Sequence, residues 1–373
     1  MRTVRFGVVG CGLMGREFAS AAARWCHLEG VSAKPEIVAV CDADPAAMEW
    51  FGAHFEVPLQ TTRYSELLAD PAVEAVYCAV PHHRHEELYT ATLAAGKHLF
   101  AEKPFGIDLP AAERISAAVD AKPELLVRCS SEFPYFPGAQ RIAKMASEGA
   151  FGRILEVRAG FCHSSDLDPN KAINWKRRIA TNGEYGCMGD LGLHVLHLPL
   201  RLGFRAKNVR ALLSNVVETR PDGHGGTAPC ETWDNAILAC ESTEGFPMIF
   251  ETKRISPGDT NTWSLRILGT KNSAEFSTRH PKTLRTMPYE PGGPQAWREE
   301  DLGYAGATQT ITGSIFEFGF TDAILQMWAA YLEELAGNRP AFPCATPEEA
   351  LASHRLFTAA LESQRTGRTV EVG

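Results

Sequence analysis

The feature that most constrains this chain is a glycine turn between an expected strand and an expected helix. Residues 4–9 form a short apolar run typical of a buried strand, and the sequence Gly10-Cys-Gly12-Leu-Met-Gly15 follows directly. Alanine-rich residues 16–24 then predict a helix. In this context Gly10 permits the tight turn, Gly12 lets a pyrophosphate approach the backbone, and Gly15 lets the helix pack on the strand. The pattern predicts a dinucleotide site with the phosphates at the helix N-terminus. A glycine turn that binds no nucleotide is the alternative.

An acidic residue follows the second expected strand, Ile37–Cys41. Asp42 stands where such folds place the carboxylate that bonds the adenosine ribose, although its distance from Gly10 exceeds the usual ~20 residues. We expect residues 25–34 to form an extended connection that accounts for the difference. A carboxylate there would repel a 2′-phosphate, and Ala43 offers no positive charge to hold one. NAD is therefore favoured over NADP, and an exposed Asp at a strand end is the alternative.

Strands and helices alternate through the first third of the chain. Apolar runs at 73–80 and 97–101 predict further strands, a short strand is expected at 125–127, and helices are expected at 86–95 and 110–120. This alternation indicates a doubly wound parallel sheet, which binds ligands at the carboxyl ends of its strands. We expect a Rossmann domain over residues 1–125.

The rest of the chain has a different pattern. Strand-like runs with little helix between them occupy 154–161, 209–217, 233–241, 246–254, 263–268 and 274–277, and several alternate apolar with polar residues. That alternation predicts a largely antiparallel, open-faced sheet with one covered face. Residues 281–312 are expected to be loop-rich, and helices are expected at 318–336 and from 346 to Gly367. The fold class is therefore α/β followed by α+β, with residues 126–373 as a substrate-binding and oligomerisation domain.

Composition limits the partners. The chain has 373 residues and a net charge of −8, which argues against nucleic acid or an anionic membrane as the main partner. No apolar run approaches the ~18 residues of a membrane helix, and strand residues begin too early for a signal peptide. The 10 cysteines include no C-x-x-C pair. We expect reduced thiols in a cytoplasmic protein.

A second glycine-rich stretch, residues 183–198, leads into a helix that carries two residues suited to proton transfer. Asp190 and His194 are four apart and share one helix face, so a carboxylate could support an imidazole as acid or base. A capping Asp with a buried His is the plain alternative. A metal site from Asp190, His194 and His197 is a third, but we expect none, and we interpret the cluster at 82–85 as a loop with cofactor contacts.

Glu102-Lys103-Pro104, preceded by the glycine turn and followed by Gly-x-x-x-Asp190-x-Gly-x-His194, resembles the glucose–fructose oxidoreductase and inositol dehydrogenase family (Gfo/Idh/MocA). The likeness covers nearly the whole chain, from the glycine turn at 10–15 through the loop at 79–85 to the tail at 363–370. It implies hydride transfer between a nicotinamide and a sugar or cyclitol carbon. We also expect identical chains to assemble as a dimer or tetramer through the free face of the C-terminal sheet.

The resemblance also implies the site residues. Lys103, Asp190 and His194 would be catalytic. His194 would be the acid or base on the reacting hydroxyl, Lys103 would bond substrate and nicotinamide, and Asp190 would orient the substrate and His194. Trp175 and Lys176 would join these three at the substrate. The cofactor would contact Gly10, Gly12, Leu13, Met14, Gly15, Asp42, Ala79, Pro81, His82, His85, Glu102 and Lys103.

Two departures from the family pattern bear on the substrate. His197 stands where many members carry an Asp, and the region where many carry an Arg-Phe pair reads Glu132-Phe133-Pro134-Tyr135 here. An NAD-dependent sugar or cyclitol dehydrogenase is the favoured function. A nicotinamide-bound sensor or scaffold without turnover is the alternative, and an oxidoreductase that retains its cofactor is a variant of the first.

Overall fold

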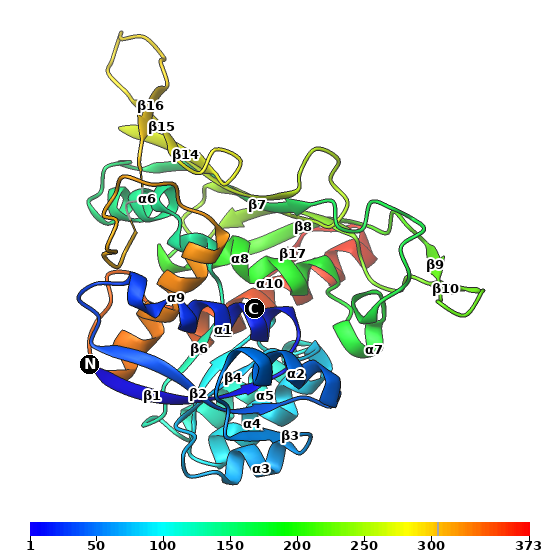
Figure 1. Ribbon diagram of the computed structural model, residues 1–373. Helices are drawn as coiled ribbons and strands as arrows, with labels where there is room; N and C mark the ends of the chain where they lie inside the picture. The colour runs from blue at the N-terminus through cyan, green and yellow to red at the C-terminus, as the bar shows by residue number, and fades with distance from the viewer. Residues whose placement is uncertain (304–305) are drawn as a thin grey trace.

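The computed structural model, which describes residues 1–303 and 306–373, contains a parallel sheet and a larger mixed sheet with helices between them (Figure 1). The first is a six-stranded sheet in the order β3-β2-β1-β4-β5-β6, with every neighbouring pair parallel. Its strands are β1 (Arg2–Val9), β2 (Ala33–Cys41), β3 (Leu59–Thr61), β4 (Ala75–Cys78), β5 (His98–Ala101) and β6 (Val127–Cys129). The predicted Rossmann sheet is confirmed.

Helices α1 (Leu13–Ala23), α2 (Pro45–His54), α3 (Tyr64–Ala69), α4 (His85–Ala94) and α5 (Leu109–Asp120) connect these strands. Asp44 caps α2 by accepting from the Ala46 N–H. Two expected boundaries were wrong. Strand β2 begins at Ala33, so residues 33 and 34 are not part of the connection, because the chain already pairs with β1 at Arg2. The strand expected at 125–127 lies two residues later, where it pairs with β5.

The second sheet has nine strands in the order β16-β15-β14-β13-β7-β12-β11-β8-β17. It is mostly antiparallel, as predicted, although β7 and β12 run parallel. The strands are β7 (Ile154–His163), β8 (Ala206–Ser214), β11 (Asn235–Ser242), β12 (Pro247–Lys253), β13 (Asn261–Gly269), β14 (Asn272–Ser277), β15 (Thr283–Pro288), β16 (Arg298–Asp301) and β17 (Val370–Glu371), and β9 (Thr219–Pro221) and β10 (Thr227–Pro229) form a separate hairpin.

The expectation of a loop-rich 281–312 was partly wrong. Strands β15 and β16 extend the sheet beyond β14, and they form the projection at the top of Figure 1. The guanidinium groups of Arg266 and Arg285 lie 5.4 and 5.2 Å from the Trp297 ring, which are stabilising contacts at this edge. Residues 304 and 305 of that stretch lie outside the described residues.

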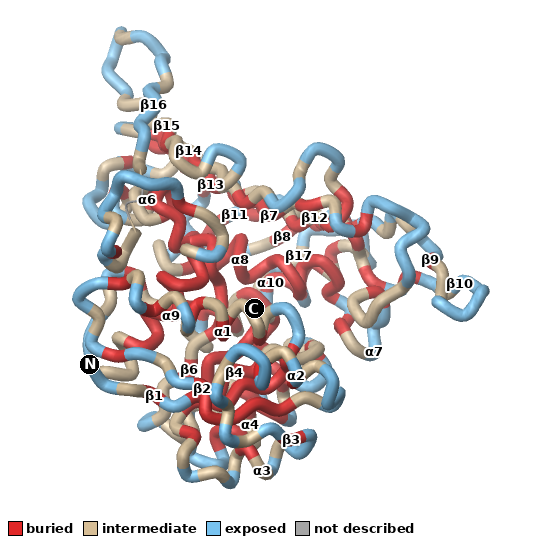
Figure 2. Tube along the Cα trace, in the orientation of Figure 1, coloured by how far each residue is buried: buried red, intermediate tan, exposed pale blue. Residues whose placement is uncertain are grey.

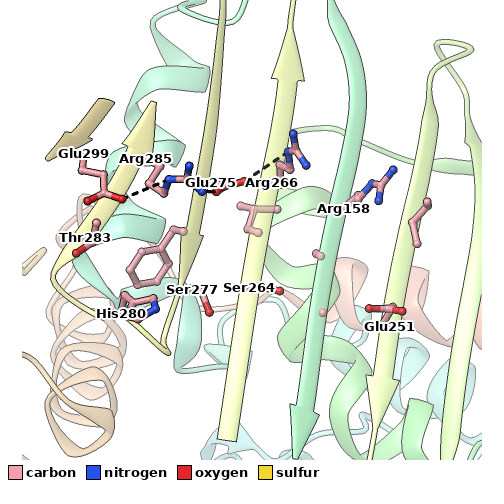
Figure 3. Close-up of a pocket in the computed structure, with 15 residues that line it drawn as sticks. Arg158, Glu251, Ser264, Arg266, Glu275, Ser277, His280, Thr283, Arg285 and Glu299 are labelled. Carbon is pink, nitrogen blue, oxygen red and sulfur yellow. Dashed lines mark hydrogen bonds and ion pairs between the residues drawn. The ribbon is translucent and has the colours of Figure 1, made fainter. Parts of the chain in front are cut away.

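One face of the mixed sheet is covered and the other is open. Helices α6 (Pro137–Ser147), α8 (Cys187–Arg201) and α10 (Pro347–Thr366) contact its strands, and residues such as Trp263 and Phe250 are buried there. The opposite face carries half-buried and exposed side chains, which line a cavity of about 590 Å³ shown in Figure 3. The expected open face is therefore present.

Helix α9 (Phe320–Leu335) joins the two halves of the chain. It packs on α1, and the Trp328 ring centroid lies 3.9 Å from that of Phe18 and 4.4 Å from that of Phe100. Residues 323–332 of α9 are all buried, and Figure 2 shows buried segments in red at this junction. No helix of the described residues is long and apolar enough to cross a membrane.

Candidate functional site

The glycine turn has the geometry that its spacing predicts. Gly10 has a φ of +92°, its N–H donates to the Cys41 carbonyl at 2.9 Å, and a Cβ there would lie 2.1 Å from the Ala79 carbonyl oxygen. A Cβ on Gly15 would lie 2.1 Å from the Gly10 carbonyl oxygen. These two glycines are therefore required by the fold itself.

Gly12 has neither a positive φ nor a close backbone contact that would require a glycine. A Cβ on Gly12 would meet no atom within 4 Å, and no side chain caps the α1 helix that begins after it. The backbone at Gly12 is therefore open to a ligand and the first turn has no side-chain cap, which fits a bound diphosphate. Leu13 and Met14 begin the same helix, and Leu13 is 75% exposed.

Asp42 lies directly beside this turn. Its carboxylate accepts from the Cys11 N–H at 2.7 Å and from the Asp44 N–H at 2.9 Å. Both contacts hold the carboxylate at the carboxyl end of β2. It therefore occupies the place where a ribose-binding carboxylate is expected in this fold.

The loop after β4 brings two histidines to the domain junction. His82 is buried, with Nδ1 3.0 Å from the Asn182 carbonyl oxygen, and its ring lies 4.9 Å from that of Trp175. His85 lies deeper, with its ring nitrogens 2.7 Å from the Pro104 oxygen and 3.0 Å from the Val80 oxygen. These contacts leave His85 no free nitrogen for a cofactor, whereas Ala79 and Pro81 lie on the loop itself.

Glu102 and Lys103 follow β5 and point in different directions. The Glu102 carboxylate is buried and accepts from the Tyr77 hydroxyl at 2.7 Å. Lys103 reaches the second domain, where Nζ donates to the Asp190 backbone oxygen at 2.7 Å and to its carboxylate at 3.2 Å. Burial disfavours its charge, but Asp190 and Glu102 outweigh that effect and raise the pKa of Lys103.

Asp190 is surrounded by three cations. Lys176 donates to both of its carboxylate oxygens at 2.9 and 3.1 Å, and Arg254 and Lys103 contact it as well. Burial would raise the pKa of Asp190, but these cations hold it well below its usual range. Burial, together with Arg254 and Lys103, lowers the pKa of Lys176 to about 8 despite the opposing effect of Asp190.

A buried ion-pair network contacts this cluster through Arg254. Arg254 donates from Nε to Asp166 at 2.8 Å, and Arg177 donates to Asp166 at 2.6 Å and also contacts Asp234. All four of these residues are buried, with at most 5% of each exposed. Sequence reasoning missed Arg254 and Asp166; an Arg and an Asp that follow strands β12 and β7 were the only signal.

His194 lies one helical turn after Asp190 and faces a different carboxylate. Its Nδ1 is 3.5 Å from Oε2 of Glu132, and its ring stands edge-on to Phe133 and Phe161, with centroids 5.4 and 5.5 Å away. Burial and the charge of Lys103 lower the pKa of His194 well below its usual value. The imidazole is therefore neutral, as a proton acceptor must be.

His197 is directed away from this cluster. Its Nε2 lies 3.3 Å from Arg201, and its ring packs 5.2 Å from Phe342. Within residues 1–303 and 306–373, no group of three His, Cys, Asp or Glu side chains is placed to hold a metal ion. The helical face at 190, 194 and 197 therefore does not converge on one point.

Two family descriptions match the chain. Residues 4–128 match the oxidoreductase family with an NAD-binding Rossmann fold, and residues 139–275 match the GFO/IDH/MocA C-terminal domain. The chain belongs to the Gfo/Idh/MocA oxidoreductase family. It is therefore an NAD(P)-dependent oxidoreductase that acts on CH–OH groups, and the predicted enzyme class is confirmed.

Similar family members include dehydrogenases. Levoglucosan dehydrogenase of Pseudarthrobacter phenanthrenivorans is 26% identical over 350 residues, which cover 85% of this chain and 89% of that protein. Human trans-1,2-dihydrobenzene-1,2-diol dehydrogenase is 28% identical over 192 residues, covering 51% of this chain and 53% of that one. A solved levoglucosan dehydrogenase in complex with NADH and L-sorbose has a TM-score of 0.89 at 24% identity, with both chains fully covered, and therefore shares the fold.

Proposed function

We propose that this protein is an NAD-dependent dehydrogenase that oxidises a hydroxyl-bearing carbon of a sugar or a cyclitol such as an inositol. The observation that carries the proposal is the contact between Lys103 and Asp190, with His194 one helical turn away. The Lys103–Asp190 contact joins the carboxyl end of a Rossmann strand to the second domain. A nicotinamide and its substrate would meet at this junction. The levoglucosan dehydrogenase relative supports a sugar-like substrate.

Each residue has a distinct role in this proposal. When bound, the nicotinamide takes or gives the hydride. Neutral His194 takes the hydroxyl proton at Nε2 during oxidation and returns it during reduction. Lys103 has three N–H donors, of which Asp190 accepts two, so one remains for the substrate oxygen as its negative charge develops.

Asp190, Lys176 and Trp175 form the wall of the substrate site in this proposal. The carboxylate fixes both ammonium groups, and the Lys176 ammonium lies 5.5 Å from the Trp175 ring centroid. An aromatic face beside cations and a carboxylate suits a ligand with several hydroxyl groups. We expect no metal to take part, so chelation should leave activity unchanged.

The test is a panel of sugars, anhydrosugars, cyclitols and trans-dihydrodiols, each assayed for NADH formation with NAD. Activity on one polyhydroxylated class is expected. If NADH binds but no compound in the panel is oxidised, and the corresponding ketones are not reduced, the sensor or scaffold function gains. If the cofactor purifies with the protein and exchanges slowly, the variant that retains its cofactor is supported.

We also propose that identical chains assemble through the open face of the mixed sheet. Arg158, Arg266 and Arg285 lie there among Glu251, Glu275 and Glu299 (Figure 3). A patch with both charges can pair with itself across a two-fold axis. Ser264 lies on this face, so Ser264→Arg should convert a dimer or tetramer to smaller species in light scattering, whereas Thr243→Arg in an exposed loop should not.

A further inference from the structure

Glu132 and His194 form a pair that the proposed roles do not explain. Oε2 of Glu132 and Nδ1 of His194 are both buried, and neither has a hydrogen-bond partner among the residues that the structure describes. They lie 3.5 Å apart, and the side chains of His194 and Glu132 are 4% and 5% exposed. Two unsatisfied polar atoms that face each other in a buried place need an explanation.

We propose that Glu132 is the positioning residue of His194 and that its protonation state decides which ring nitrogen carries the proton. As a carboxylate, Glu132 accepts from Nδ1–H, and Nε2 then presents a lone pair to the substrate hydroxyl. As a carboxylic acid, Glu132 donates to Nδ1, and Nε2–H then faces the substrate carbonyl. This inference rests on the proposed function, because it assumes that His194 handles the substrate proton.

The surroundings hold the pair in this arrangement. The edge-on contacts with Phe133 and Phe161 hold the imidazole ring in place, and Trp263 donates from its indole nitrogen to the His194 backbone oxygen at 2.8 Å. A gap of 3.5 Å exceeds an ordinary hydrogen bond. Such contacts are often long without substrate and shorten in the reacting complex.

The proton affinities of the two groups support the proposal. Burial and the nearby Glu102 raise the pKa of Glu132 to about 7, whereas burial and Lys103 lower the pKa of His194 well below its usual value. A proton given to the pair therefore rests on Glu132. The charged groups that act on Glu132 are Glu102, Lys103 and Glu17, and those that act on His194 are Lys103, Asp190, Lys176 and His197.

The proton count closes. During oxidation the hydroxyl proton moves to Nε2, the Nδ1 proton moves to the Glu132 carboxylate, and the hydride leaves the same carbon for the nicotinamide. The imidazole stays neutral throughout, which avoids a second buried cation close to Lys103. After the product departs, the reverse shift through His194 returns the proton to the open site.

The first test compares pH profiles of kcat/KM for oxidation. Wild type should gain activity as the pH rises through about 7, where Glu132 ionises. Glu132→Gln should lose that rise and about 10²-fold of kcat, with NADH affinity unchanged. Glu132→Asp should keep the rise with a partial rate. The matched control is Glu334→Gln. The Glu334 carboxyl pairs with Arg128 at 2.5 Å, and burial raises the pKa of Glu334 as it does that of Glu132. The Glu334→Gln enzyme should keep both the wild-type rate and the wild-type pH profile.

The second test needs no substrate. Nitrogen NMR of the imidazole rings, assigned with His194→Gln, should show the His194 proton moving from Nε2 to Nδ1 between about pH 6 and 8, and this change should be absent in Glu132→Gln. A folded Glu132→Gln enzyme with the wild-type rate and profile would sink the inference while the proposed function stands. If the tautomer changes but the protein oxidises no substrate, the proposed function is contradicted, whereas the coupling of Glu132 to His194 is supported.

Discussion

Lys103 and Asp190 join the two domains through two hydrogen bonds from one ammonium group. The bond to the backbone oxygen is 2.7 Å long and the bond to the carboxylate is 3.2 Å long. Lys103 follows a strand of the Rossmann sheet, and Asp190 lies in the first turn of α8. Since the pKa of Lys103 is raised, the ammonium stays charged throughout the neutral range.

Lys103→Met should abolish turnover and leave cofactor binding intact. The variant keeps most of the side-chain length and removes the charge, and loss of one such donor typically costs ~10²–10³ in rate. The glycine turn and Asp42 are untouched, so NADH affinity should change by less than about tenfold, or ~1.4 kcal/mol. Steady-state rates and NADH fluorescence titration measure the two effects.

The control for this variant is Lys97→Met. The Lys97 ammonium donates to the backbone oxygens of Asp70 and Val73 at 3.1 and 2.7 Å, remote from Asp190. It should alter stability and leave kcat near wild type. A Lys103→Met enzyme that turns over normally would make Lys103 a structural residue only.

Cofactor preference should depend on Asp42. Its carboxylate is held by the Cys11 and Asp44 N–H groups beside the glycine turn, where it would bond ribose hydroxyls and repel a 2′-phosphate. Asp42→Ser with Ala43→Arg should shift the ratio of kcat/KM values toward NADP by at least about tenfold. If the wild type uses NAD and NADP equally, Asp42 does not select the cofactor.

The sequence predicted the parts of the site that depend on local spacing. Gly10, Gly12 and Gly15 act within one strand-turn-helix unit, so their pattern is visible in six consecutive residues. The same holds at the helix expected from residue 346, where Thr346 and Glu349 form a capping box within four consecutive residues. By contrast, Arg254 reaches Asp190 across 64 residues, and no local pattern encodes that contact.

Glu132 shows a second limit of sequence reasoning. The spacing of Asp190 and His194 on one helix pairs those two residues, yet the carboxylate nearest to the His194 Nδ1 belongs to Glu132. The sequence marked Glu132 only as a departure from the family pattern. Its position opposite His194 depends on how the segment after β6 packs against α8, which is a tertiary property.

Arg254 should be required for stability. Its guanidinium contacts the buried carboxylates of both Asp190 and Asp166, so Arg254→Met leaves each with one cation fewer. Breaking a buried ion pair from one side costs about 3–5 kcal/mol of unfolding free energy. The exposed pair of Arg114 with Glu86 provides the control, since an exposed ion pair contributes little and Arg114→Met should cost far less stability than Arg254→Met. Urea denaturation measures the free energy of unfolding of both variants. Equal losses in the two would contradict a stabilising role for the buried ion-pair network.

Acid should destabilise the protein because several histidines are buried in the neutral form. Burial lowers the pKa of six buried histidines, and that of the half-buried His98 as well; the six are His82, His85, His163, His194, His197 and His354. For His85 and His163 the value falls to about 4. In the unfolded chain the same groups titrate near ~6.5.

The sign follows from proton uptake. Below about pH 6.5 the unfolded chain binds these protons and the folded chain does not, so the free energy of unfolding falls by about 1.4 kcal/mol per pH unit for each group. Glu132 acts in the opposite direction, because its pKa is raised to about 7, and it offsets one histidine. Urea unfolding between about pH 7 and 5 should therefore show a steep loss of stability. His197→Gln should reduce that slope by about one proton, and His224→Gln, at an exposed position, should leave it unchanged. Stability that stays flat over this range would mean that the six histidines are not buried neutral in solution.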